Sequence, residues 1–152
     1  MLISENTLKW VMRFYPPLLF QRIWVRHFDT DFLGVDVKIF KSVFNLNYNR
    51  SIFGGTIYAA ADPFYAVLYY QAMRRKGYNV VVWQKAAEIF YLKPGMSNLY
   101  FSITITKEEI NTLSKKLDET GKAEQYCTLE IKDIRGEICA RVISLVYIRK
   151  LD

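Results

Sequence analysis

The sequence has 152 residues, of which 51% are hydrophobic and 16% are aromatic. This length is typical of one domain, and the apolar content is sufficient for a packed core, which excludes a disordered chain. The formal net charge of +6 is spread along the chain, and the one tight basic cluster is Arg74-Arg75-Lys76. That cluster falls at a predicted helix end, where cations complement the helix dipole, so the charge pattern does not indicate a nucleic-acid-binding protein.

Neither a membrane span nor an export signal is predicted. No apolar run reaches the ~20 residues that cross a bilayer. The stretch from Trp10 to Trp24 is interrupted by Arg13, two prolines and Arg22, which does not fit a signal peptide. In a chain without an export signal, Cys127 and Cys139 are expected to be buried, reduced thiols. The sequence therefore predicts a cytoplasmic protein.

The chain is predicted to begin with a short helix over residues 4–15, capped by Ser4 and ended by Pro16-Pro17. The apolar segment from Leu18 to Val25, with Arg22 and Arg26 nearby, fits either an amphipathic helix on a membrane surface or a segment packed across a sheet edge. The second is favoured. Residues 1–24 are thus interpreted as a helical extension of a single domain, 1–152.

A half-buried strand is predicted over residues 31–43, where apolar and polar residues alternate. Its apolar positions are Leu33, Val35, Val37, Ile39 and Val43. His27, the only histidine, stands before this strand without other metal-binding residues near it in the sequence. A surface or structural histidine is therefore expected, and no metal site.

Residues 45–77 are the segment around which the chain is organised. An asparagine-rich turn leads into Gly54-Gly55, and an apolar helix follows that carries a single acid, Asp62. Glycines at this place allow another molecule to approach the backbone closely. Asp62 lies seven residues after Gly55, close to two helical turns, so both share one face if the helix is continuous.

Four strands and one more helix are predicted after this segment. Thr106 and Glu109 form a capping box for an amphipathic helix that ends at Gly121. The strands cover residues 80–91, 99–105, 123–132 and 137–149, separated by turn sequences such as Pro94-Gly95. The order predicts an α+β fold in which a curved antiparallel sheet wraps around one long central helix.

Several short motifs give the chain a family resemblance. They are Tyr15-Pro16-Pro17, residues 47–49, Phe53-Gly54-Gly55, Ala61-Asp62-Pro63, Val82-Trp83 with Lys85, and Lys93-Pro94-Gly95. With the order of elements, they resemble a hot-dog fold family of unassigned function that is described as thioesterase-like. A related pattern belongs to the phenylacetyl-CoA type of acyl-CoA thioesterase: an asparagine, a His-Gly-Gly, then an aspartate on the central helix. Asn47 and Asp62 fit that spacing; Phe53 replaces the histidine and Arg50 a glycine.

The resemblance implies a thioester-hydrolysing site made of Asn47, Gly55 and Asp62. The Gly55 N–H would stabilise the oxyanion, Asp62 would act as general base or nucleophile, and Asn47 would position the water or the carboxylate. It also implies a homodimer, or a tetramer made of two dimers, with Asp62 of one chain facing Gly55 of its partner. Coenzyme A would enter only as part of the substrate, and no cofactor is expected.

Substrate-binding residues are expected around this site. Gly54 and Phe53 would line it, while Tyr58, Phe64 and Tyr65 belong to the core or to the wall of an acyl tunnel, where Tyr58 would contact the substrate. Arg50 and Lys93 are candidates for contacts with coenzyme A phosphates. Lys85 and Glu88 are charges on an apolar strand, which together with Gln84 either line a dimer groove or belong to structural ion pairs, the latter being favoured.

Simpler structural interpretations exist for the same residues. Asp62 before Pro63 is typical of an N-cap followed by a first-turn proline, which would begin a separate helix. Gly54-Gly55 fits a tight turn, and Asn47 and Asn49 fit turn residues that bond their own backbone.

Three functions are compatible with the sequence. The first is acyl-CoA hydrolysis. The second is non-catalytic binding of an acyl group or small hydrophobic molecule, which the absence of histidine at Phe53 favours. The third, a hydratase or dehydratase, needs a histidine with an acid, and His27 lies outside the central segment.

Overall fold

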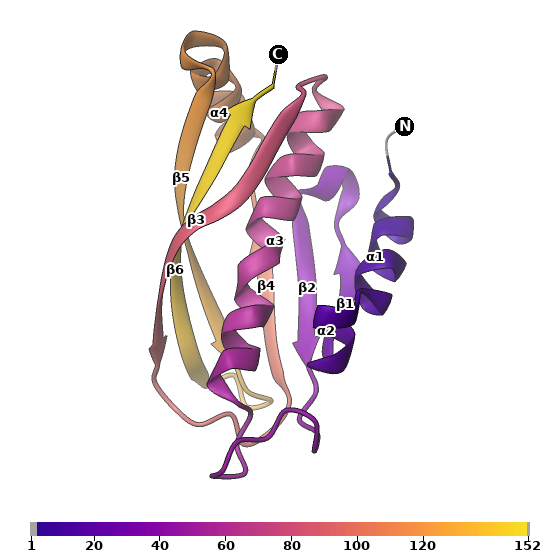
Figure 1. Ribbon diagram of the computed structural model, residues 1–152, viewed down its shortest axis with the longest axis vertical. Coiled ribbons are helices and arrows are strands. Elements are labelled where there is room, and N and C mark those ends of the chain that lie inside the picture. The colour runs from indigo at the N-terminus through magenta and orange to yellow at the C-terminus, as the bar shows by residue number, and fades with distance from the viewer. Residues whose placement is uncertain (1–2, 152) are drawn as a thin grey trace.

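The computed structural model describes residues 3–151 and contains one six-stranded antiparallel sheet that curves around a long helix (Figure 1). The strand order is β1-β2-β4-β5-β6-β3. In chain order the elements are α1 (Glu5–Phe14), α2 (Pro16–Phe20), β1 (Ile23–Phe28), the 3-10 turn η1 (Thr30–Phe32), β2 (Gly34–Ile39), α3 (Gly54–Arg75), β3 (Val80–Tyr91), β4 (Leu99–Thr104), α4 (Lys107–Thr120), β5 (Lys122–Lys132) and β6 (Ile138–Lys150). The expected hot-dog architecture is confirmed.

The N-terminal segment differs in detail from the prediction. Ser4 caps α1 as expected, because its side chain accepts from the Thr7 N–H at 3.1 Å. Pro16 ends that helix but also begins another, since a proline at the first helical position needs no hydrogen-bonding partner. The following residues form β1, an edge strand paired with β2, which the sequence analysis did not predict.

The strand predicted over residues 31–43 is shorter than expected. Residues 30–32 form η1, and β2 ends at Ile39. Val35, Val37 and Ile39 are buried as predicted, whereas Val43 is exposed in the loop that leads to α3. The alternation in the sequence thus identifies the strand but overestimates its length.

The central helix α3 is continuous through Pro63. Proline removes one backbone hydrogen bond, to the carbonyl of Ala59, and helices tolerate this loss when packing holds both halves in place. Ala60, Ala61, Phe64 and Leu68 provide that packing, because they are fully buried against the concave face of the sheet. The alternative in which Asp62 caps a separate helix is therefore wrong.

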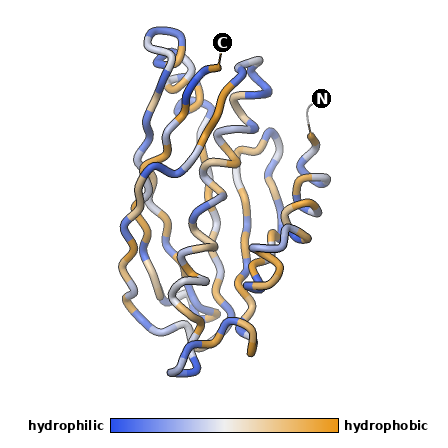
Figure 2. Tube along the Cα trace, in the orientation of Figure 1, coloured by the Kyte–Doolittle hydropathy of each residue, from blue (hydrophilic) through white to orange (hydrophobic). Residues whose placement is uncertain are grey.

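The core lies between α3 and the inner faces of the strands. Hydrophobic and hydrophilic positions alternate along β4, β5 and β6 (Figure 2). The buried residues of α3 include Ile57, Phe64 and Leu68. Both cysteines are buried free thiols, as predicted. Within residues 3–151, no helix is both long enough and apolar enough to cross a membrane.

The predicted capping box of α4 is present. Thr106 Oγ1 accepts from the Glu109 N–H at 3.0 Å, and Glu109 Oε2 accepts from the Thr106 N–H at 2.6 Å. Gly121 closes the helix with a φ of 72°, a conformation that favours glycine.

Replacing Thr106 with alanine is expected to lower the free energy of unfolding by about 1 kcal/mol, because the Glu109 N–H in the first turn loses its acceptor, Thr106 Oγ1. For a domain of this size that loss corresponds to a decrease in Tm of about 2–4 °C. Thermal unfolding followed by circular dichroism measures it. Lys107→Ala, an exposed change in the same turn, is the matched control and should leave Tm unchanged; an equal decrease in both variants would contradict the capping role.

Candidate functional site

The N-terminus of α3 presents backbone donors that are not used within the fold. Phe53 is the N-cap residue, and its carbonyl accepts from the N–H groups of Thr56 and Ile57. Among residues 3–151, the N–H groups of Gly54 and Gly55 have no acceptor. Because they stand at the positive end of a 22-residue helix, they favour a negatively charged oxygen.

Both glycines lie against an aromatic ring. A Cβ atom on Gly54 would lie 3.0 Å from the Tyr91 ring, whose hydroxyl donates to the Gly54 carbonyl at 2.9 Å. A Cβ atom on Gly55 would lie 2.3 Å from the Phe53 ring. The exposed Phe53 ring thus covers Gly55, at the position where the resembling thioesterases carry histidine.

Asn47 organises the loop that precedes this helix. Its Oδ1 accepts from the N–H groups of Asn49 and Ser51, and its Nδ2 donates to Ser51 Oγ at 2.8 Å. Arg50 closes the turn with a φ of 56°. The turn interpretation of Asn47 is therefore confirmed, and within the described chain its side chain makes no hydrogen bond to Gly55 or Asp62.

Asp62 lies on the exposed face of α3, beneath the edge strand β3. Gln84 of β3 donates its Nε2 to Asp62 Oδ1 at 2.9 Å. Partial burial raises the pKa of Asp62, because desolvation disfavours the carboxylate. Gln84 Oε1 is buried and has no partner among the residues described. A carboxylate held by one amide, with a raised pKa, is suited to accept a proton.

Asp62 and Gly55 are far apart within one chain. Seven residues of a continuous helix correspond to a rise of about 10 Å. A carbonyl group and its attacking water together span roughly 6–7 Å between the groups that bind them. One chain therefore contains the two parts of a hydrolytic site, an anion-binding helix end and a carboxylate, but holds them too far apart to act on one thioester.

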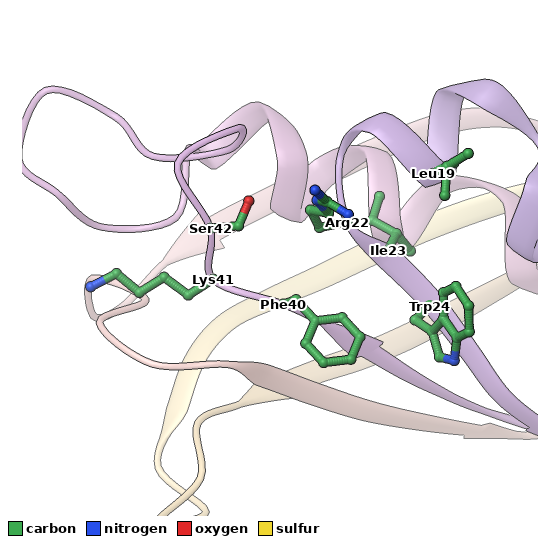
Figure 3. A pocket seen from close by; sticks show the side chains of 7 residues that line it. All are labelled: Leu19, Arg22, Ile23, Trp24, Phe40, Lys41 and Ser42. Carbon is green, nitrogen blue, oxygen red and sulfur yellow. The ribbon is translucent and has the colours of Figure 1, made fainter.

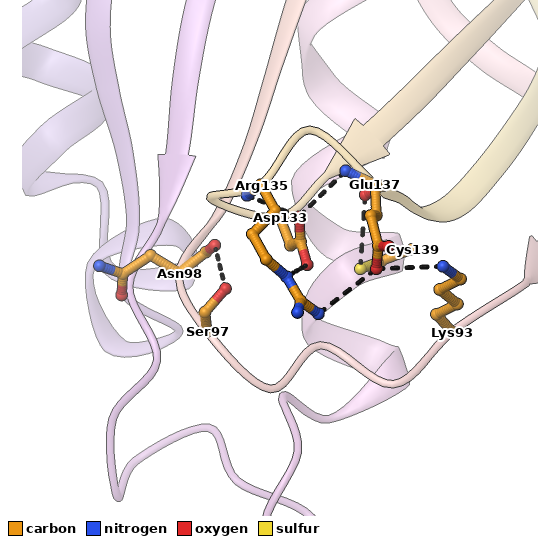
Figure 4. Close-up of polar contacts among 7 residues, drawn as sticks. All are labelled: Lys93, Ser97, Asn98, Asp133, Arg135, Glu137 and Cys139. Atoms are coloured by element: carbon orange, nitrogen blue, oxygen red, sulfur yellow. Dashed lines mark hydrogen bonds and ion pairs between the residues drawn. The ribbon is translucent and has the colours of Figure 1, made fainter.

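Two of the basic residues singled out in the sequence, Lys85 and Lys93, form ion pairs. Lys85 Nζ lies 2.6 Å from Glu124 on the outer face of the sheet, opposite to Asp62, which confirms the ion-pair interpretation for Lys85; Glu88 forms no ion pair within residues 3–151. Lys93 Nζ lies 3.0 Å from Glu137, in a polar cluster at the β5–β6 turn (Figure 4). Arg50 is exposed beside the α3 N-terminus. His27 is a surface residue, 3.4 Å from Asp29, as expected.

Tyr91 is a site residue that sequence reasoning missed, and Gln84 was noted without its link to Asp62. Simple alternation places residues seven apart on opposite faces of a strand. In β3 a bulge at Lys85 shifts the pairing with β6, and Gln84 and Tyr91 then share the inner face. A bulge of this kind leaves no clear signal in a single sequence.

Other catalytic groups are scarce in the part of the chain that the structure describes. No group of three histidine, cysteine or acidic residues in it could hold a metal ion. Burial raises the pKa of the Cys127 thiol to about 11, which leaves it protonated and unreactive at neutral pH. Asp62 and the α3 N-terminus are thus the candidates for chemistry.

The sequence matches a family described as a domain of unknown function, DUF4442, over residues 4–148. Among curated proteins there is no match. Solved structures with the same fold include a Pseudomonas aeruginosa protein of unknown function named a "probable thioesterase" (TM-score 0.89, 16% identity, 99% of each chain covered).

Two further solved structures cover nearly the whole chain. A thioesterase from Haemophilus influenzae has a TM-score of 0.72 and 12% identity, with 99% of this chain and 96% of that chain covered. The PaaI protein of the Escherichia coli phenylacetic acid degradation operon has a TM-score of 0.65 and 15% identity, with 98% and 97% covered. At these identities the similarity establishes the fold.

Proposed function

Because this chain belongs to the DUF4442 family and has a hot-dog fold found in thioesterases, we propose that it hydrolyses acyl or aryl thioesters. The observation that carries the proposal is the pair of free N–H groups at the α3 N-terminus, on the same helix as a carboxylate of raised pKa. Donors and a base are the two groups that thioester hydrolysis needs.

In the proposed reaction, water attacks the thioester carbonyl carbon while one of its protons passes to Asp62. The carbonyl oxygen becomes an oxyanion, which the Gly55 N–H stabilises. When the C=O bond re-forms, the C–S bond breaks and the leaving thiolate takes the proton from Asp62. The products are a carboxylic acid and a thiol. In a second version Asp62 attacks first, and water hydrolyses the mixed anhydride. Asn47 contributes by shaping the loop before Gly54.

We infer that the complete site needs two chains. Within residues 3–151, β3 has a neighbour on one side only. Antiparallel pairing of β3 with β3 of a second copy would satisfy that edge and place the two α3 helices side by side in opposite directions. Because the two helices run in opposite directions, the N-terminal end of one α3 lies beside a more C-terminal part of the other. Gly55 of one chain can then lie next to Asp62 of its partner. Two such dimers could form the tetramer considered above.

The substrate would lie between the α3 N-terminus and β3. Phe53, Tyr58 and the backbone at Gly54 provide apolar walls for an acyl or aryl group. Arg50 is exposed beside them and is the first candidate for coenzyme A phosphates. Lys85 and Lys93 would need to leave their partners Glu124 and Glu137, which costs little at an exposed position. Coenzyme A is thus proposed as part of the substrate.

A second function is supported by one specific contact. The Phe53 ring packs on Gly55, where the resembling enzymes have a histidine, so this site could bind an acyl group without hydrolysing it. Such a protein would be stabilised by the ligand but would release no thiol.

A panel of acyl- and aryl-CoA substrates, with thiol release as the readout, separates the two functions. Hydrolysis predicts turnover of at least one substrate by the wild type. Ligand-dependent stabilisation with no turnover across the panel would contradict hydrolysis and support the binding protein.

A further inference from the structure

The edge of the sheet opposite β3 carries exposed aromatic and basic side chains that the proposed site does not use. This edge consists of α1, α2, β1 and residues 40–44, on one side of the molecule in Figure 1. We define the aromatic–basic surface by its exposed aromatic residues, Trp10, Phe14, Tyr15, Phe20, Phe40 and Phe44, together with the cations beside them. Single exposed apolar residues are ordinary, whereas a contiguous group marks an interaction surface.

Direct contacts make this surface continuous. The rings of Trp10 and Phe14 stack with centroids 6.1 Å apart. The Arg13 guanidinium lies 4.5 Å from the ring of Trp10 and 4.5 Å from that of Trp24, which connects α1 to β1.

The loop formed by residues 40–44 is connected to the same surface. The Arg22 guanidinium lies 4.7 Å from the Phe44 ring. Asn45 fixes the loop to the end of α2, because its Nδ2 donates to the carbonyls of Gln21 and Phe40. These contacts hold the aromatic–basic surface in a fixed arrangement within the fold.

Its charge has one sign. The stretches 6–28 and 37–61 contain no aspartate or glutamate. They contribute six cations to this side, and within residues 3–151 none of the six forms an ion pair with a carboxylate. They are Lys9, Arg13, Arg22, Arg26, Lys38 and Lys41. A surface of this kind attracts a polyanionic partner.

A pocket of about 430 Å³ opens between α2 and the loop (Figure 3). Its walls include Leu19, Trp24 and Phe40, and Arg22 supplies positive charge, while the Lys41 side chain extends away from the pocket and its ammonium donates to the Met96 carbonyl at 3.0 Å. Apolar walls beside a cation suit a molecule that joins an acyl chain to an anionic head group.

We propose that the aromatic–basic surface docks on a bilayer that contains anionic phospholipids. Phe20, Val43 and Phe44 are the most exposed apolar residues here, at 72%, 84% and 68% exposure, and would enter the boundary between head groups and acyl chains. The surrounding arginines and lysines would contact the anionic head groups, and the tryptophans would lie at the interface.

Other partners fit the same surface less well. A nucleic acid supplies phosphates, but it offers no apolar phase for a valine and two phenylalanines at the tip. A second copy would oppose cations to cations, since Glu5 of α1 is already paired with Arg75 and the aromatic–basic surface itself contains no carboxylate. Dimerisation through β3 leaves this surface open, and docking does not depend on thioesterase activity.

The test is co-sedimentation of the full chain with vesicles of phosphatidylcholine, with and without about one third phosphatidylserine. The wild type should bind the anionic vesicles, bind the neutral ones at least tenfold less, and lose binding as salt increases. Tryptophan emission should shift to shorter wavelength on binding. Failure to bind anionic vesicles, or equal binding to both, would overturn the proposal.

Two double variants identify the surface. Phe20→Ser with Phe44→Ser, and Arg22→Gln with Lys41→Gln, should each weaken binding about tenfold or more while the circular dichroism spectrum stays unchanged. Tyr126→Ser with Ile134→Ser is the matched apolar control, with exposures of 71% and 65%. Lys116→Gln with Lys122→Gln is the charge-matched control. Controls that weaken binding as much as the test variants would overturn the assignment.

Two outcomes would redirect the assignment. If single-stranded oligonucleotides bind more tightly than vesicles and the same variants abolish that binding, the surface is for nucleic acid. If the test variants change only the oligomeric state of the protein, the surface joins two copies.

Discussion

The Asp62→Asn variant is expected to hydrolyse thioesters about 10²–10⁴-fold more slowly than the wild type. Asparagine keeps the size of the side chain and the oxygen that accepts from Gln84 Nε2, but it cannot take a proton from water. The change therefore removes the proposed base with little disturbance of its surroundings. Initial rates of thiol release, measured with the best substrate of the panel, give the ratio.

The same variant should be at least as stable as the wild type at neutral pH. Because the pKa of Asp62 is raised on folding, the folded chain binds that proton more tightly than the unfolded chain does. The wild type then loses stability as pH rises from the ordinary pKa of aspartate, about 4, to the raised value, and the whole penalty is present above it. Asparagine carries no such penalty. In the wild type, activity should fall as pH decreases through the raised pKa.

Glu88→Gln is the control for Asp62→Asn. Glu88 is a carboxylate on the outer face of β3, where it is paired in register with Ile143, so its neutralisation changes net charge equally without touching the site. Its turnover should equal that of the wild type. Full activity in Asp62→Asn, or an equal loss in both variants, would contradict the role of Asp62.

The Gly55→Pro variant is expected to lower turnover about 10²–10³-fold, because proline removes the N–H that stabilises the oxyanion. Proline is tolerated in the first helical turn, where the N–H groups have no intrahelical acceptor. Its φ matches that of the helix, so α3 should still form. Thiol release and the circular dichroism spectrum measure the two effects separately.

Gly55→Ala is the matched control for this variant. It keeps the N–H and adds a Cβ atom, as proline also does, so the Phe53 ring has to move in both variants. Activity should be much closer to that of the wild type than in Gly55→Pro. If the alanine variant loses as much activity as the proline variant, the loss comes from the added side-chain atoms and not from the missing N–H donor.

Local signals made much of this fold predictable. The capping box at Thr106 and Glu109 depends on residues three apart, and the structure contains it as expected. The alternation of β4 and the long central helix also follow from neighbouring residues. The continuity of α3 through Pro63 could not be decided locally, because it depends on the packing of Phe64 and Leu68 against distant strands.

Irregular strands were the features that a single sequence concealed. In β1 the pairing shifts between Val25 and His27, which breaks the alternation that would identify a strand. In β3 the bulge at Lys85 sends Gln84 to Asp62 and Lys85 to Glu124 on the opposite face. Asn47, by contrast, fits its turn because its hydrogen bonds stay within the loop.

The central claim, that two chains build one hydrolytic site, is tested most directly by mixing two inactive variants. Asp62→Asn and Gly55→Pro are co-expressed with different tags, and the mixed dimers are verified by mass spectrometry. About half of randomly formed dimers are mixed and one of the two sites in each is intact, so about one quarter of wild-type turnover should return. Mixed dimers that show no more activity than either variant alone would contradict a shared site.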